Sequence, residues 1–136
     1  MNGAKYYKKK LIADGLLEFE MTAKSVAKAK LLRKKIVNQQ KRLRQVKRQI
    51  NLEMTEIRAN YRAKTGAAGS GGSFLLSLLG SRREAGKWRA DAKRSLQKER
   101  DKKLKPYDQV KLMIDDMLVQ LDGAKLQTDQ YIDEES

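Results

Sequence analysis

The chain has 136 residues, of which 40% are hydrophobic and only 6% aromatic, and its net charge at pH 7 is +14. This composition suits one domain of helices with thin apolar seams better than a thick globular core or two independent cores. The chain contains neither Cys nor His, which excludes disulfides and thiolate metal sites and removes the usual proton shuttle of enzymes. We therefore expect a protein that is not an enzyme and that uses no cofactor and no metal.

Positive charge is concentrated in the first half of the chain. Residues 1–64 carry 18 basic and 5 acidic side chains, whereas residues 107–136 carry 2 and 8. An excess of this size repels itself unless an anionic partner compensates it. No segment resembles a signal peptide or approaches the roughly 18 apolar residues of a membrane span, so we expect a soluble, cytoplasmic chain with an anionic partner.

Residues 1–15 form a basic N-terminal segment that contains the stretch "KYYKKK". Two structures fit it: a short helix that ends at Asp14 and Gly15, or an arm that becomes ordered only on a partner. Its cations and aromatic rings can contact nucleic-acid bases or a membrane interface, or simply remain solvated. The candidate polyanion-binding residues here are Lys8, Lys9 and Lys10.

Residues 16–64 contain no Gly and no Pro and predict one long basic helix. Gln39 and Gln40 interrupt its apolar seam, and a buried polar layer there would fix the register of a partner helix. The apolar residues recur every three or four positions and include Ile36, Leu43, Val46, Ile50 and Ile57.

A row of cations on this helix points away from the apolar seam. It consists of Lys34, Lys41 and Arg48 and continues past Thr55 to Arg62, with Arg44 nearby. Such a row can bind phosphates without reading sequence, or it can be an ordinary solvated face. We take these residues as polyanion-binding candidates.

Residues 65–81 combine a Gly- and Ser-rich stretch with a short apolar one. "GAAGSGGS", residues 66–73, predicts the end of the long helix and a flexible tip, and it lacks the Lys and the Ser or Thr of a phosphate-binding loop. The apolar stretch can dock to a partner, plug the end of a helix pair, or dip into a membrane surface. Its docking candidates are Phe74, Leu75, Leu76, Leu78 and Leu79.

Residues 82–133 predict a second helical arm, which begins after the capping box "SRRE" and is kinked or broken at Pro106. Its seam residues are Trp88, Ile114, Met117 and Leu121. Beside the seam, Asp108, Asp115, Asp122 and Asp129 recur every seven residues, where they can pair with Arg33, Lys35, Arg42 or Lys47. The doublet Asp115 and Asp116 diverges by about 100° on a helix and so does not form a metal site. Residues 134–136 are a tail.

The two arms have similar lengths, which favours an all-α fold: a long, coiled-coil-like antiparallel hairpin with a flexible Gly-rich tip. These features are generic and indicate no particular family. We expect a non-enzymatic scaffold or adaptor of a larger assembly, docking through its apolar seam and its basic face to an anionic partner. The alternative is a basic coiled-coil protein that binds DNA or RNA without sequence specificity. A protein partner or self-association is favoured over an anionic membrane, and no small-molecule substrate is expected.

Overall fold

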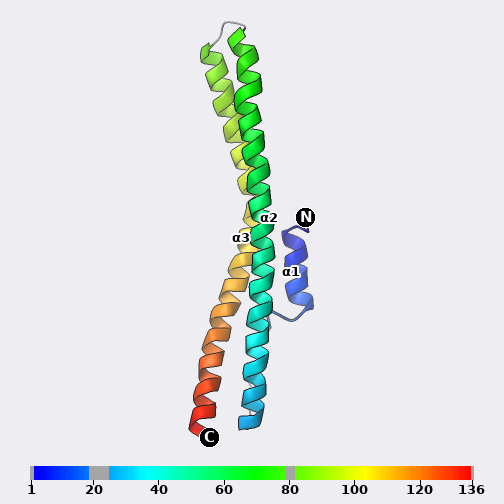
Figure 1. The fold of residues 1–136 in the computed structure, drawn as a ribbon, viewed down its shortest axis with the longest axis vertical. Coiled ribbons are helices and arrows are strands. Elements are labelled where there is room, and N and C mark those ends of the chain that lie inside the picture. The colour runs from blue at the N-terminus through cyan, green and yellow to red at the C-terminus, as the bar shows by residue number, and fades with distance from the viewer. Residues whose placement is uncertain (1, 19–24, 79–81, 136) are drawn as a thin grey trace. The chain divides into compact units, whose positions relative to one another are not determined.

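The protein is all-helical across the residues that the structure describes. The computed structural model describes the backbone of residues 2–18, 25–78 and 82–135, and the side chains of these residues except 67–78, 82–85 and 88. It contains helices α1 (Ala4–Ala13), α2 (Val26–Leu78) and α3 (Arg82–Glu135), and none of the described residues forms a strand (Figure 1). The chain divides into two compact units: unit 1 holds Met1–Asn51 and Tyr107–Ser136, and unit 2 holds Leu52–Pro106.

The N-terminal segment forms the short helix α1, which lies alongside α2 in unit 1 (Figure 1). Its buried residues Ala4, Tyr7 and Leu11 are spaced three and four apart and share one helical face. The helix ends at Ala13, and Gly15 just after it has the left-handed φ of 66° that glycine tolerates best. The Gly15 and Leu16 amides donate to the carbonyls of Ile12 and Leu11 at 3.1 and 3.0 Å, which is a Schellman motif. Leu11 and Leu16 are both buried, so the motif turns the chain while keeping its apolar residues covered.

Helix α2 begins and ends later than the sequence predicted. It starts at Val26 rather than at residue 16, and the Ser25 hydroxyl caps it by accepting from the Lys28 amide at 3.2 Å. It then continues through the Gly-rich residues 66–73 to Leu78, so the boundary predicted between residues 64 and 65 is wrong. Glycine weakens a helix but keeps its amide donor, and each residue added to an existing helix gains one backbone hydrogen bond.

Helix α3 begins at Arg82, as the capping box predicted, although Ser81 itself lies outside the described residues. It runs through Pro106 to Glu135, so the predicted alternative of a broken second arm is wrong. A kink at Pro106 stays a prediction. Residues 79–81, which include the docking candidate Leu79 and the place of the flexible tip, also lie outside the described residues.

In unit 1 the helices α2 and α3 run antiparallel. The side-chain contacts Arg33 to Asp129, Gln40 to Asp122 and Lys47 to Asp115 show this, because seven residues forward on α2 correspond to seven residues backward on α3. The apolar seam lies between these helices and is closed within the chain. Its buried members are Ala29, Ile36, Leu43, Val46 and Ile50 on α2, and Tyr107, Val110, Ile114, Met117, Leu121 and Ala124 on α3.

Unit 2 contains the C-terminal part of α2 and the N-terminal part of α3. Met54, Ile57 and Tyr61 of α2 and Leu104 of α3 are buried there. The side chain of Trp88, a predicted seam residue, lies outside the described residues. None of the described helix segments has the length and hydropathy that crossing a bilayer requires.

Candidate polyanion-binding surface

The carboxylates of α3 in unit 1 are aligned with polar side chains of α2. Arg33 Nε lies 2.6 Å from Asp129 Oδ1, and Lys47 Nζ lies 2.6 Å from Asp115 Oδ1. Between these pairs, Gln40 Nε2 donates to Asp122 Oδ1 at 2.6 Å. Gln40 is only 3% exposed, so it forms the polar layer within the seam that the sequence predicted. Partly exposed ion pairs contribute only about 0 to 1 kcal/mol each, and their main effect is to favour one register.

A second set of α2 cations has no such partners. Lys34, Lys41 and Arg48 are exposed, and none of them forms an ion pair with an acid in the described part of the chain. Each follows an α2 residue that contacts α3, namely Arg33, Gln40 and Lys47. Because neighbouring residues on a helix diverge by about 100°, Lys41 and Arg48 turn away from α3, whereas Lys34 lines a hollow of about 510 Å³ together with Asp129 and Asp133 of α3. We call Lys34, Lys41 and Arg48 the basic row.

The basic row borders a groove where the end of α1 meets α2. The groove has a volume of about 480 Å³, and Lys35, Lys41 and Arg42 bring three cations to it. Asp14 is the one acid among its lining residues. Lys41 therefore belongs both to the basic row and to the groove. The other residues that line it are Gly15, Leu16, Asn38, Gln39 and Gln45.

Hydrogen bonds from α2 hold the wall of this groove in place. Gln39 Nε2 donates to the carbonyls of Leu16 and Glu18 at 2.8 and 3.0 Å, so one side chain fixes the chain that follows α1. Beside the groove, a smaller hollow of about 220 Å³ is lined by Lys10 and Arg42 together with Asp14. Lys10 of α1 is thus brought to the same side of unit 1 as Arg42. The groove and the smaller hollow together gather cations of α1 and α2.

Unit 2 carries a separate cationic pocket of about 370 Å³ between α2 and α3. Its cations are Arg58 and Arg62 from α2 and Lys93 and Arg100 from α3, and no acid is among its lining residues. The remaining lining residues are Tyr61, Thr65, Leu96 and Gln97.

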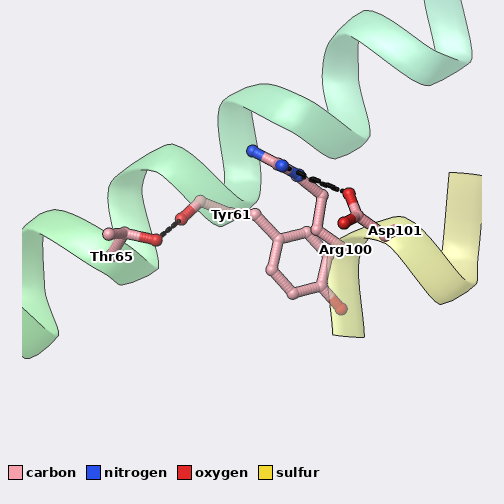
Figure 2. Close-up of polar contacts among 4 residues, drawn as sticks. All are labelled: Tyr61, Thr65, Arg100 and Asp101. Carbon is pink, nitrogen blue, oxygen red and sulfur yellow. Dashed lines mark hydrogen bonds and ion pairs between the residues drawn. The ribbon is translucent and has the colours of Figure 1, made fainter. Parts of the chain in front are cut away.

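Tyr61 anchors the wall of the unit 2 pocket. Its hydroxyl donates to Glu99 Oε1 at 2.9 Å, and the ammonium groups of Lys64 and Lys103 lie 4.8 and 5.4 Å from its ring centroid. Figure 2 shows Arg100 reaching from α3 beside Tyr61, with its Nε and one terminal nitrogen donating to Asp101 Oδ1 at 3.2 and 3.1 Å. Thr65 Oγ1 donates to the Tyr61 carbonyl at 2.7 Å, so that hydroxyl is already used within the helix.

The predicted binding residues are distributed over both units. Lys8, Lys9, Arg44 and Arg62 are exposed, as is the basic row, whereas Lys10 is half-buried. Four of the docking candidates belong to α2, but the structure does not describe their side chains: Phe74, Leu75, Leu76 and Leu78. Their docking role stays a prediction.

Sequence reasoning missed five of the cations that the fold gathers. Lys35 and Arg42 were predicted to pair with the carboxylates of α3, but both line the groove beside α1. Lys93 and Arg100 of the unit 2 pocket carried no signal, because their position depends on how α3 packs against α2. Arg58 lines the same pocket and was overlooked, although it lies one turn before Arg62.

Among the described residues, no three acidic side chains lie close enough together to hold a metal ion. The geometry of the described residues is that of two cationic hollows, one where α1 meets α2 and one between α2 and α3. Comparison with known proteins adds nothing to it, since no protein-family model, no curated protein and no solved structure matches this chain.

Proposed function

We propose that this chain is a non-enzymatic helical adaptor that docks onto an anionic partner through the basic row of α2 and the groove beside it. The observation that carries this proposal is the sorting of cations on one helix. Arg33 and Lys47 pair with the chain's own carboxylates, while Lys34, Lys41 and Arg48 stay exposed. Cations that form no ion pair within the described part of the chain are available to an external partner.

From the sequence we expected the apolar seam to dock to a partner, whereas this proposal gives the seam no role in docking. Ile36, Leu43 and Ile50 are fully buried against the chain's own α3, so docking through them would require the helices to separate. The proposal therefore assigns the seam to folding and the basic row to docking. Self-association or a larger assembly remains part of the proposal through other surfaces.

The second candidate is a protein that binds DNA or RNA without sequence specificity. Residues 30–50 favour it, because they carry nine Lys or Arg side chains and no acid. Cations at helical spacing displace counterions from a phosphate backbone, which gives affinity that falls steeply with salt. Both candidates use the same surface, and the chemistry of the partner separates them.

The test is a salt titration of binding to random duplex DNA, single-stranded RNA and poly-glutamate. The variant reverses the basic row, with Lys34, Lys41 and Arg48 each changed to Glu. The matched control reverses three exposed unit 2 lysines, Lys98, Lys102 and Lys105, and changes the net charge by the same amount.

We expect the basic-row variant to lose far more affinity than the control. For duplex DNA, each lost phosphate contact should flatten the slope of log K against log salt by about 0.9. Tight, salt-sensitive binding of DNA or RNA favours the nucleic-acid candidate. Binding of poly-glutamate with no nucleic-acid binding at about 0.1 M salt favours an acidic protein partner. Equal losses in both variants would contradict a specific role for the basic row.

A further inference from the structure

Helix α3 carries an apolar stripe that does not belong to the seam. Leu112, Val119 and Leu126 are 63%, 71% and 61% exposed. Single exposed apolar residues are ordinary, but these three recur every seven residues and so lie on one face of the helix. We call these three residues the α3 stripe. Its regular spacing indicates a face that a partner helix can cover.

The surroundings of the α3 stripe are acidic. Asp115 and Asp122 lie three residues beyond Leu112 and Val119, and Asp116 lies on the other flank, so carboxylates border the stripe on both sides. Asp115 keeps 44% of its side chain exposed although it pairs with Lys47. In a chain of net charge +14, this is a local concentration of negative charge on an apolar face.

Gly123 supplies a second, independent observation on the same face. It lies inside α3, four residues after Val119 and three before Leu126. A Cβ built on it would meet nothing within 4 Å, so no contact within the described chain requires glycine there. Glycine in a helix interior is unfavourable relative to alanine, and its small size lets another backbone approach closely.

From these observations we infer that the α3 stripe is the docking surface for an amphipathic helix of another protein, with apolar residues at seven-residue spacing flanked by Lys or Arg. Charge complementarity selects this occupant. A second copy of α3 would place carboxylates against carboxylates. Helix α2 of a second copy would supply cations, but it has no continuous apolar stripe. At seven-residue spacing from its exposed Leu31 come Asn38 and Gln45 before the next apolar residue, Leu52. This surface is separate from the basic row, and the inference does not depend on polyanion binding.

The test uses the full chain and a synthetic four-heptad helical peptide with Leu along one face and Lys on both flanks. The net charge of the protein repels such a peptide, so binding reports the acidic stripe rather than general attraction. The variant changes Leu112 and Val119 to Ser. The matched control changes Leu31 and Leu52, which are exposed on α2, to Ser. Circular dichroism checks that both variants keep their helix content.

We expect the stripe variant to bind the peptide at least about tenfold more weakly, while the control binds like the unchanged chain. Reversal of the basic row should leave peptide binding intact, so this inference and the proposed function fail in different experiments. The inference is overturned if the peptide does not bind, or if both variants weaken it equally. It is also overturned if sedimentation shows that the chain self-associates and that the stripe variant abolishes this.

Discussion

Two glycines show how the same residue type has opposite roles in unit 1. Gly15 ends α1 with a φ of 66°, a left-handed conformation that residues with a Cβ adopt only with strain. Gly123 lies in the middle of α3 with ordinary helical geometry and open space where a Cβ would be. The backbone conformation requires glycine at the first position and opposes it at the second.

Substitution by alanine should therefore have opposite signs at these two sites. Gly15→Ala should lower the free energy of unfolding by about 1 to 2 kcal/mol, because alanine is strained in the left-handed region. Gly123→Ala should raise it by about 1 kcal/mol, because alanine is the better helix former and meets no neighbour. Urea unfolding followed by circular dichroism measures both. A stabilising Gly15→Ala or a destabilising Gly123→Ala would show that these local environments are misassigned.

The pairing of α2 with α3 follows from the spacing of apolar and acidic residues along the two helices. Apolar residues every three or four positions identify the buried face of α2, and the regular row of Asp residues on α3 identifies the edge that meets Arg33 and Lys47. Burial of an apolar side chain stabilises the fold by about 1.5 to 3 kcal/mol, whereas a surface ion pair contributes only about 0 to 1 kcal/mol. Exposed residues of the same helix therefore contribute little to stability.

This difference gives a matched pair of substitutions on α2. Ile36 is 0% exposed and Leu31 is 59% exposed, although both are large aliphatic residues of one helix. We expect Ile36→Ala to lower the free energy of unfolding by about 2 to 5 kcal/mol and Leu31→Ala by less than about 0.5 kcal/mol. Thermal unfolding of the two variants in parallel checks this, and similar losses in both would argue against the assigned seam.

Periodic features of this fold are readable from sequence, whereas the two ends of α2 are not. Ile36, Leu43 and Ile50 recur every seven residues, which identifies the buried face of the helix. Assigning the buried face one residue earlier or later would place all three in solvent. The end of α2 depends instead on whether elongation outweighs the low propensity of four glycines in residues 66–73, which no pattern decides.

Part of the candidate binding surface is likewise predictable from sequence, and part of it depends on tertiary packing. The row of Lys34, Lys41 and Arg48 follows from helical spacing, and the structure leaves all three exposed. The groove that adds Lys35 and Arg42 exists because α1 folds back along α2. That contact joins segments far apart in sequence, and a single sequence contains no direct signal for it. The same limit applies to the cationic pocket of unit 2.

For the molecule as a whole, excess positive charge is present in both units. Unit 1 carries 17 basic and 11 acidic residues, and unit 2 carries 14 and 6. In unit 1 most of the acids lie on α3, where Asp115 and Asp129 pair with Lys47 and Arg33 of α2, while Lys41 and Arg48 stay exposed. Each unit thus keeps a cationic surface, and that of unit 1 is accompanied by the acidic apolar stripe of α3.

Lysine footprinting tests docking through the basic row on the chain without substitutions, because it identifies the lysines that a bound polyanion covers. The reactivity of each lysine toward an acetylating reagent is compared by mass spectrometry in the presence and absence of whichever polyanion binds. We expect Lys34 and Lys41 to lose reactivity on binding, whereas Lys111 and Lys125 of α3 should keep theirs. Protection spread evenly over all lysines, or centred on α3, would contradict it.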